Sequence, residues 1–126
     1  MKKAMCILRE VITPYQRAFH TSPLAYDIAI DTQILPEGEY EADSYIMRPH
    51  EFCLFRSYEY VKMPETHYGL LFLRRRYAQR KLLFAGGVVH PKWEGHLLIE
   101  LYNAGEQPLR IKRGERPVTL LLIPLV

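Results

Sequence analysis

Short stretches in which every second side chain is apolar run through most of the chain. Tyr26, Ile28 and Ile30 alternate with smaller or acidic residues, which is the period of a half-buried β-strand. Turn-forming residues separate such stretches, as in Pro36-Glu37-Gly38, where proline presets one dihedral angle and glycine permits a positive φ. Many short strands between turns are typical of a sandwich, jelly roll or barrel. We therefore predict an all-β fold, with further strands at residues 45–47, 52–55, 58–63, 69–73, 82–84, 88–89, 96–102, 109–112 and 118–124.

The two ends of the chain differ from this pattern. Residues 4–12 fit one short helix, which Thr13-Pro14 ends because proline disfavours helix in the residue before it. Residues 118–125 are apolar on both faces of the strand they form. Such a strand is covered twice, either by a neighbouring subunit or as an internal strand of its own sheet.

The composition is that of one globular domain. The 126 residues are 48% hydrophobic and 25% charged, so we expect a single domain over residues 1–126, with an N-terminal segment 1–21 and a β core 22–126. The net charge of +3 is too small to indicate nucleic acid as a partner. Arg9 and Glu10 interrupt the only apolar stretch near the N-terminus, so we expect no signal peptide, no membrane span and a cytoplasmic location. Cys6 and Cys53 are expected to be reduced thiols.

No standard metal or nucleophile motif is present. The possible soft ligands lack zinc-site spacing, and no zinc site is predicted; they are His50, Cys53, His67, His90 and His96. The chain also lacks a G-x-S-x-G motif, a P-loop and a G-x-G-x-x-G motif.

Two segments carry candidate chemistry. The strand at 96–102 places Glu100 opposite Leu97, Ile99 and Leu101, so this carboxylate either faces water or is held by a partner. The second segment is a basic run that either binds phosphate or forms a solvated face, and it contains Arg74, Arg75, Arg76, Arg80 and Lys81.

Around Glu100 the sequence resembles a known family. Residues 90–103 read H-P-K-W-E-G-H-L-L-I-E-L-Y-N, which resembles the dCTP deaminase pattern D-P-G-[WF]-x-G-x-[ILV]-x-L-E-[FLI]-x-N. Residues 24–28 and 59–64 are similar to two earlier segments of that family, and Gly114 with residues 119–125 is similar to its end. The chain thus resembles the trimeric dCTP deaminase and dUTPase family over about residues 22–125.

The chain also departs from the family pattern. The signature G-R-S-S-x-A-R falls on residues 73–79, where both serines are replaced, by Arg75 and Arg76, and the second arginine by Gln79. His90 stands where the family has an aspartate, and Thr119 where it often has glutamine. The last strand runs to the end of the sequence, so the glycine-rich lid of the dUTPase branch is not expected.

The resemblance implies a distorted jelly roll of the β-clip type, a homotrimer with sites between subunits, and a deoxynucleoside triphosphate, dCTP or dUTP, as ligand. Magnesium would arrive on the nucleotide phosphates. By the resemblance, Glu100 and His90 are the catalytic candidates. The substrate-binding candidates are Arg74, Arg75, Arg76, Gln79, Arg80, Trp93 and Tyr102. The alternative is a catalytically inactive trimer that acts as a binding, regulatory or structural protein.

Overall fold

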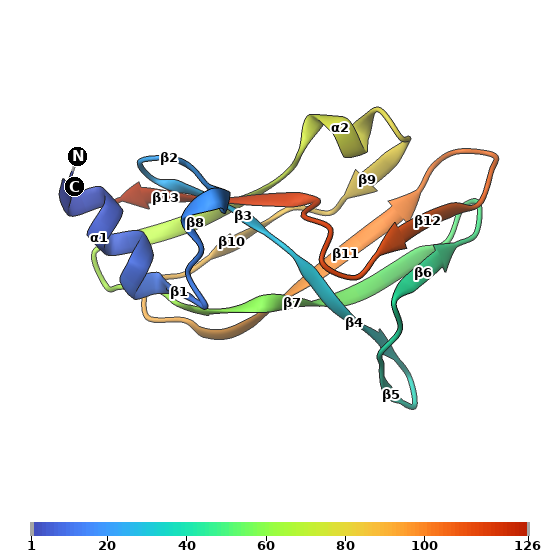
Figure 1. The fold of residues 1–126 in the computed structure, drawn as a ribbon, viewed down its shortest axis with the longest axis horizontal. Coiled ribbons are helices and arrows are strands. Elements are labelled where there is room, and N and C mark those ends of the chain that lie inside the picture. The colour runs from blue at the N-terminus through green and yellow to red at the C-terminus, as the bar shows by residue number, and fades with distance from the viewer. Residues whose placement is uncertain (1, 126) are drawn as a thin grey trace.

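The computed structural model describes the backbone of residues 2–125 and the side chains of residues 7–125. Its strands form two main antiparallel sheets and a separate two-stranded ribbon (Figure 1). The first sheet has the order β5 (Gly38–Tyr40), β4 (Ile30–Leu35), β7 (Phe52–Lys62), β11 (Glu94–Asn103) and β9 (Leu82–Phe84), and β1 (Ile12–Thr13) also pairs with β7. The second sheet has the order β10 (Gly87–Val89), β8 (His67–Leu73), β13 (Val118–Pro124), β3 (Ala25–Ile28) and β2 (His20–Ser22).

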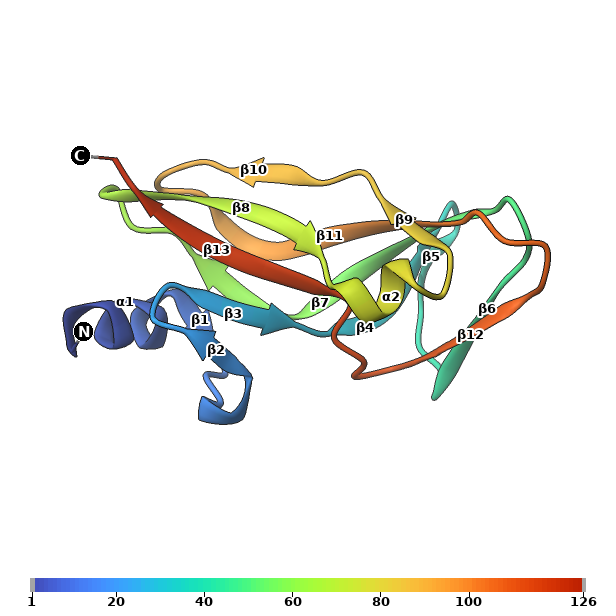
Figure 2. The same cartoon turned by 90° about the horizontal axis from the view of Figure 1, so that it is seen from above.

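The remaining elements lie at the ends and edges of the two sheets. The ribbon pairs β12 (Leu109–Lys112) with β6 (Ser44–Met47) at one end of the molecule (Figures 1 and 2). At the opposite end lie α1 (Lys2–Val11) and both chain termini. A 3₁₀ turn, η1 (Arg17–Phe19), precedes β2, and a four-residue helix, α2 (Arg75–Ala78), follows β8. The prediction of an all-β fold with a short N-terminal helix is confirmed.

The core lies between the two sheets and is built from alternate residues of the longest strands. Ile99 of β11 lies opposite Phe55 of β7, and Leu101 lies opposite Cys53, with all four side chains buried. Burial of each large apolar side chain contributes about 1.5–3 kcal/mol to folding, so this pair of strands is a main source of stability.

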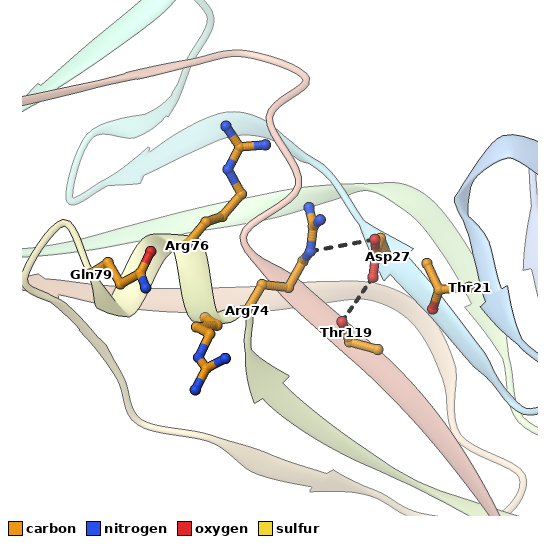
Figure 3. Close-up of a pocket in the computed structure, with 7 residues that line it drawn as sticks. Thr21, Asp27, Arg74, Arg76, Gln79 and Thr119 are labelled. Atoms are coloured by element: carbon orange, nitrogen blue, oxygen red, sulfur yellow. Dashed lines mark hydrogen bonds and ion pairs between the residues drawn. The ribbon is translucent and has the colours of Figure 1, made fainter.

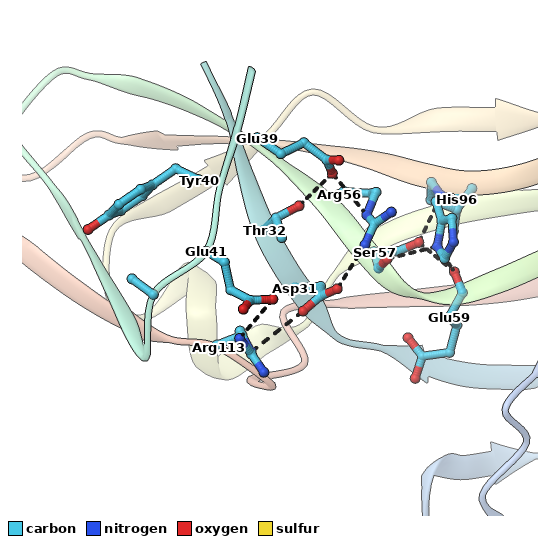
Figure 4. Close-up of polar contacts among 12 residues, drawn as sticks. Asp31, Thr32, Glu39, Tyr40, Glu41, Arg56, Ser57, Glu59, His96 and Arg113 are labelled. Atoms are coloured by element: carbon cyan, nitrogen blue, oxygen red, sulfur yellow. Dashed lines mark hydrogen bonds and ion pairs between the residues drawn. The ribbon is translucent and has the colours of Figure 1, made fainter. Parts of the chain in front are cut away.

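A β-bulge interrupts the pairing of these two strands between His96 and Leu98. The buried Ser57 hydroxyl donates to the Glu59 carbonyl oxygen (2.7 Å) and accepts from the Leu97 backbone N–H (2.8 Å). His96 Nδ1 lies 3.0 and 3.1 Å from the carbonyl oxygens of Ser57 and Glu59 (Figure 4). Because carbonyl oxygens only accept, Nδ1 carries the hydrogen, and the bulge leaves none of these buried groups unpaired.

The chain changes sheet where one continuous strand was predicted. β3 belongs to the second sheet and β4 to the first, and the break falls at Ala29. The Ala29 N–H donates to Glu59 Oε1 (2.9 Å) and its carbonyl accepts from the Tyr58 N–H (2.9 Å). The predicted half-buried alternation over residues 26–31 is wrong because Asp27 and Ala29 are both buried as well.

Several element boundaries also differ from the sequence-based expectation. Two strands were predicted at residues 52–55 and 58–63, whereas the structure has the single strand β7 over Phe52–Lys62. No helix was predicted in the arginine run, where α2 lies, and the short edge strands β2 and β5 were missed.

β13 is an internal strand of its sheet, paired with β8 on one side and β3 on the other. Val118, Leu120 and Leu122 are fully buried, whereas Leu121 and Ile123 on the other face are only half-buried. The core between the sheets thus covers one face of this doubly apolar strand, and the chain itself covers the other face only in part.

Cys53 is expected to be chemically inert. Burial, followed by the neighbouring Glu51 carboxylate, raises the pKa of the Cys53 thiol to about 11. At pH 8 only about one thiol in a thousand is then ionised, and the thiolate is the reactive form. In a Cys6→Ser variant, a thiol reagent such as DTNB at pH 8 should label the native protein far more slowly than the urea-unfolded protein. Equal rates would contradict this prediction.

Candidate functional site

The short helix α2 is anchored to the segment just before β13 and leaves its arginines exposed. The Arg74 N–H donates to the Pro117 carbonyl (2.8 Å), which fixes the turn from β8 into the helix. Tyr77 points inward and donates its hydroxyl to Glu115 Oε1 (3.0 Å). Burial and the Glu115 carboxylate both raise the pKa of Tyr77, so the hydroxyl keeps its proton and stays a donor. With Tyr77 turned inward, Arg75 and Arg76 remain exposed.

A hollow of about 530 Å³ lies between α2 and strands β2, β3 and β13 (Figure 3). We call it the arginine cavity. Its lining residues are Thr21, Asp27, Arg74, Arg75, Arg76, Gln79 and Thr119.

Asp27 is a buried carboxylate in the lining of the arginine cavity, and both of its oxygens are engaged. It lies opposite Thr119 in the pairing of β3 with β13, and the Thr119 hydroxyl donates to Asp27 Oδ1 (2.8 Å). Arg74 Nε lies 3.4 Å from Asp27 Oδ2, and Arg74 also donates to the Arg116 carbonyl (2.8 Å). Arg74 is thus held against Asp27, as Figure 3 shows, and it neutralises this carboxylate.

Arg75 and Arg76 differ from the other arginines of the run. Within residues 7–125, Arg74 and Arg80 each form an ion pair with a carboxylate, whereas Arg75 and Arg76 form none. The cavity therefore combines three guanidinium groups with one carboxylate, and the excess charge is positive. Guanidinium groups bind carboxylates and phosphates through paired, charge-assisted hydrogen bonds. The arrangement suits an anionic ligand.

Arg80, predicted as a phosphate ligand, lies outside the arginine cavity. Its guanidinium donates to the Arg110 carbonyl (2.7 Å), forms an ion pair with Glu115 (3.3 Å) and lies over the Tyr77 ring. These contacts tie α2 to the segment around β12, which is a structural role.

His90 and Trp93 border a second hollow, of about 370 Å³, between β10 and β11. Gly95 has a φ of +151°, and a Cβ there would lie 3.3 Å from the Trp93 ring, so the indole packs directly on the glycine backbone. The Trp93 carbonyl accepts from the Met63 N–H (2.8 Å), which fixes the turn. Val88, Val89 and Leu98 make the walls largely apolar, with His90 and His96 as the polar groups at the rim. An aromatic base could pack in such a hollow.

Glu100 stands on an exposed, largely apolar surface, on the face of β11 opposite Leu97, Ile99 and Leu101, as the sequence predicted. Within the described side chains it forms no ion pair or hydrogen bond, and it lines neither hollow. Leu98, Phe52 and Leu83 beside it are 59%, 66% and 56% exposed. Tyr102 packs on the Phe52 ring, with centroids 4.6 Å apart. We call this surface the Glu100 face; it consists of Phe52, Leu54, Leu83, Leu98, Glu100 and Tyr102.

The single chain thus holds its candidate residues in three places. Arg74, Arg75, Arg76 and Gln79 meet in the arginine cavity, His90 and Trp93 at the second hollow, and Glu100 and Tyr102 on the Glu100 face. The sequence assigned no role to Thr21 or Asp27. Asp27 belongs to the segment 24–28, which carried part of the family resemblance, and this resemblance was the one sequence signal that could have marked Asp27 as a site residue.

Comparisons with known proteins agree with this architecture. The family model for dCTP deaminase-like proteins matches residues 8–123. The dCTP deaminase of Pyrococcus horikoshii is 30% identical over 82% of this chain and 69% of its own length. That of Thermococcus gammatolerans is 29% identical over 91% of this chain and 75% of its own. The chain belongs to the dCTP deaminase-like family.

Solved structures show the same fold in dUTPases. The Staphylococcus bacteriophage 80alpha dUTPase with dUpNHpp has a TM-score of 0.67 and 21% identity, covering 85% of this chain and 73% of its own. A mutant dUTPase from phage phi11 of S. aureus, described with a structural Mg(II) ion, has a TM-score of 0.68 and 18% identity, covering 90% of this chain and 84% of its own. At this identity the likeness establishes the fold alone.

The described side chains do not fit a magnesium site held by the protein. Mg²⁺ takes oxygen ligands in octahedral geometry. Nowhere in residues 7–125 do three His, Cys, Asp or Glu side chains gather closely enough to hold a metal ion. Asp27, the one carboxylate of the arginine cavity, already has both oxygens engaged.

The described helices also include none that is long and apolar enough to cross a membrane.

Proposed function

We propose that this protein binds a pyrimidine deoxynucleoside triphosphate and converts it, by deaminating dCTP or hydrolysing dUTP. The observation that carries the proposal is the arginine cavity. It presents two guanidinium groups that have no carboxylate partner among the described side chains, at the segment where the family signature falls. The curated relatives named dCTP deaminase support a deoxynucleotide as the anion.

The active site is proposed to form between subunits of a homotrimer. Covering the Glu100 face removes apolar surface from water, but it also buries the Glu100 carboxylate, which is costly without a cation partner. Arg75 and Arg76 are exposed cations of the cavity without a carboxylate partner among the described side chains, and a second copy of the chain would bring its own two arginines to this face. A nucleotide between them would have its phosphates on the arginines and its base toward Glu100.

In the deamination reaction Glu100 would act as general base and then general acid. It takes a proton from a water molecule as the oxygen bonds to C4 of the cytosine ring. It then delivers a proton to the amino group, which leaves as ammonia and gives dUTP. Such proton transfers by a positioned carboxylate are worth about 10²–10⁴-fold in rate. Trp93 and Tyr102 are the proposed contacts of the base, and His90 is the second residue proposed for water activation.

The proposal is tested by incubating the protein with dCTP and with dUTP, each with and without Mg²⁺, and separating the products. Release of ammonia with formation of dUTP identifies deamination, and dUMP with pyrophosphate identifies hydrolysis. Binding of either nucleotide without product would favour the non-catalytic alternative. Absence of both binding and product would refute the proposal.

The trimer makes a separate prediction. Light scattering should give about three times the 14.9 kDa chain mass at micromolar concentration. Leu98→Lys places a charge within the apolar part of the Glu100 face and should yield a folded protein of lower mass. Ile46→Lys is the matched control, because Ile46 is 52% exposed on β6, outside that face. A wild-type mass near 14.9 kDa would contradict the trimer.

A further inference from the structure

The arginine cavity differs from a metal-assisted phosphate site in its balance of charges. Asp27 is neutralised by Arg74, so no carboxylate among the described side chains compensates the guanidinium groups of Arg75 and Arg76. In Figure 3 the side chain of Arg76 extends from α2 without a contact to the other residues drawn. The sequence pattern of the family has two small, neutral serines at these positions.

Two arginines carry as much positive charge as one Mg²⁺ ion, and they carry it at every accessible pH because the guanidinium does not deprotonate. Each can bind phosphate oxygens in the paired geometry that strengthens charge-assisted hydrogen bonds. A Mg²⁺ ion on the same phosphates would be repelled by both groups. This repulsion is strongest at short range and is only partly screened by solvent.

We propose that Arg75 and Arg76 take over the charge-neutralising role of the divalent cation, so that the phosphate tail binds the arginine cavity without Mg²⁺. The inference rests on the proposed function, since it takes the same anion as ligand. It concerns binding and makes no statement about the metal requirement of the chemical step.

The experiment is titration calorimetry of the protein with dCTP, with dUTP and with inorganic tripolyphosphate, each in EDTA and in excess Mg²⁺. For wild type we expect dissociation constants that differ by less than about threefold between the two conditions, a difference below about 0.7 kcal/mol. Tripolyphosphate should bind with the same metal independence, because it lacks the base and reports on the phosphate contacts alone.

The variant Arg75→Ser/Arg76→Ser restores the residues of the family pattern. Its affinity in EDTA should fall by at least about 100-fold, since the charge-assisted hydrogen bonds of two guanidinium groups are lost. Added Mg²⁺ should now strengthen binding by at least about tenfold. Arg48→Ala, which removes one exposed arginine after β6, controls for the loss of a surface charge outside the cavity and should leave both constants unchanged.

The possible results separate the two proposals. Nucleotide binding in Mg²⁺ but not in EDTA overturns the inference and leaves the proposed function intact. Absence of binding in both conditions, in a folded trimer, refutes the proposed function and the inference together. Equal metal dependence of wild type and the double serine variant overturns the inference alone.

Discussion

Replacing Glu100 with glutamine is expected to abolish turnover while leaving nucleotide affinity within about twofold of wild type. The amide keeps the shape of the side chain on the exposed face of β11 but cannot exchange a proton. If Glu100 transfers protons in the rate-limiting step, kcat should fall by about 10²–10⁴-fold. Product formation from dCTP or dUTP measures turnover, and calorimetry measures nucleotide affinity.

The mass of the assembly provides an internal check on this prediction. Glu100→Gln removes a charge from the Glu100 face without adding bulk, so the mass from light scattering should not change. Glu37→Gln, in the exposed turn before β5, makes the same chemical change away from the face and should keep full activity. A Glu100→Gln protein that turns over at the wild-type rate would exclude the acid–base role.

The placement of Glu100 was predictable because strand periodicity is a local property. Alternation alone puts it opposite Leu97, Ile99 and Leu101, and the structure confirms that these three are buried and Glu100 is exposed. The side of a strand on which a residue lies depends only on its immediate neighbours, so one sequence suffices for it.

The pairing of the individual arginines in the run could not be predicted from the sequence in the same way. Its arginines are adjacent and chemically identical, yet Arg74 is held by Asp27, Arg80 by Glu115, and Arg75 and Arg76 by no carboxylate among the described side chains. Both acidic partners come from distant parts of the chain. Pairing of this kind is fixed by the sheet topology, which a spacing argument along the sequence does not contain.

The same limit explains why the buried acids were missed. Asp27 and Glu59 alternate with apolar residues as solvent-facing side chains do, but both are buried, and each has a cation partner far away in sequence. A charged residue is buried only when such a partner exists. The sequence contains both members of each pair without indicating that they meet.

Replacing Arg116 with methionine is expected to destabilise the fold by about 3–5 kcal/mol, because it leaves the Glu59 carboxylate buried without its cation. Glu59 is fully buried on β7, and Arg116 donates to its Oε2 (2.5 Å) and to the Asp27 carbonyl (2.6 Å). The guanidinium also lies over the Phe19 ring. One side chain thus joins η1, β3 and β7 directly behind the arginine cavity, where the Arg116 carbonyl accepts from Arg74.

Urea unfolding at one fixed protein concentration measures this cost, since the apparent stability of an oligomer depends on concentration. The double variant Glu59→Gln/Arg116→Met should recover at least about 1 kcal/mol of the loss, because the buried charge is gone and the glutamine oxygen still accepts from the Ala29 N–H. Lys92→Met is the matched control. It breaks the exposed pair with Glu65, whose side chains are 76% and 73% accessible, and should cost less than about 1 kcal/mol. An Arg116→Met protein as stable as this control would show that the buried pair does not hold the two sheets together.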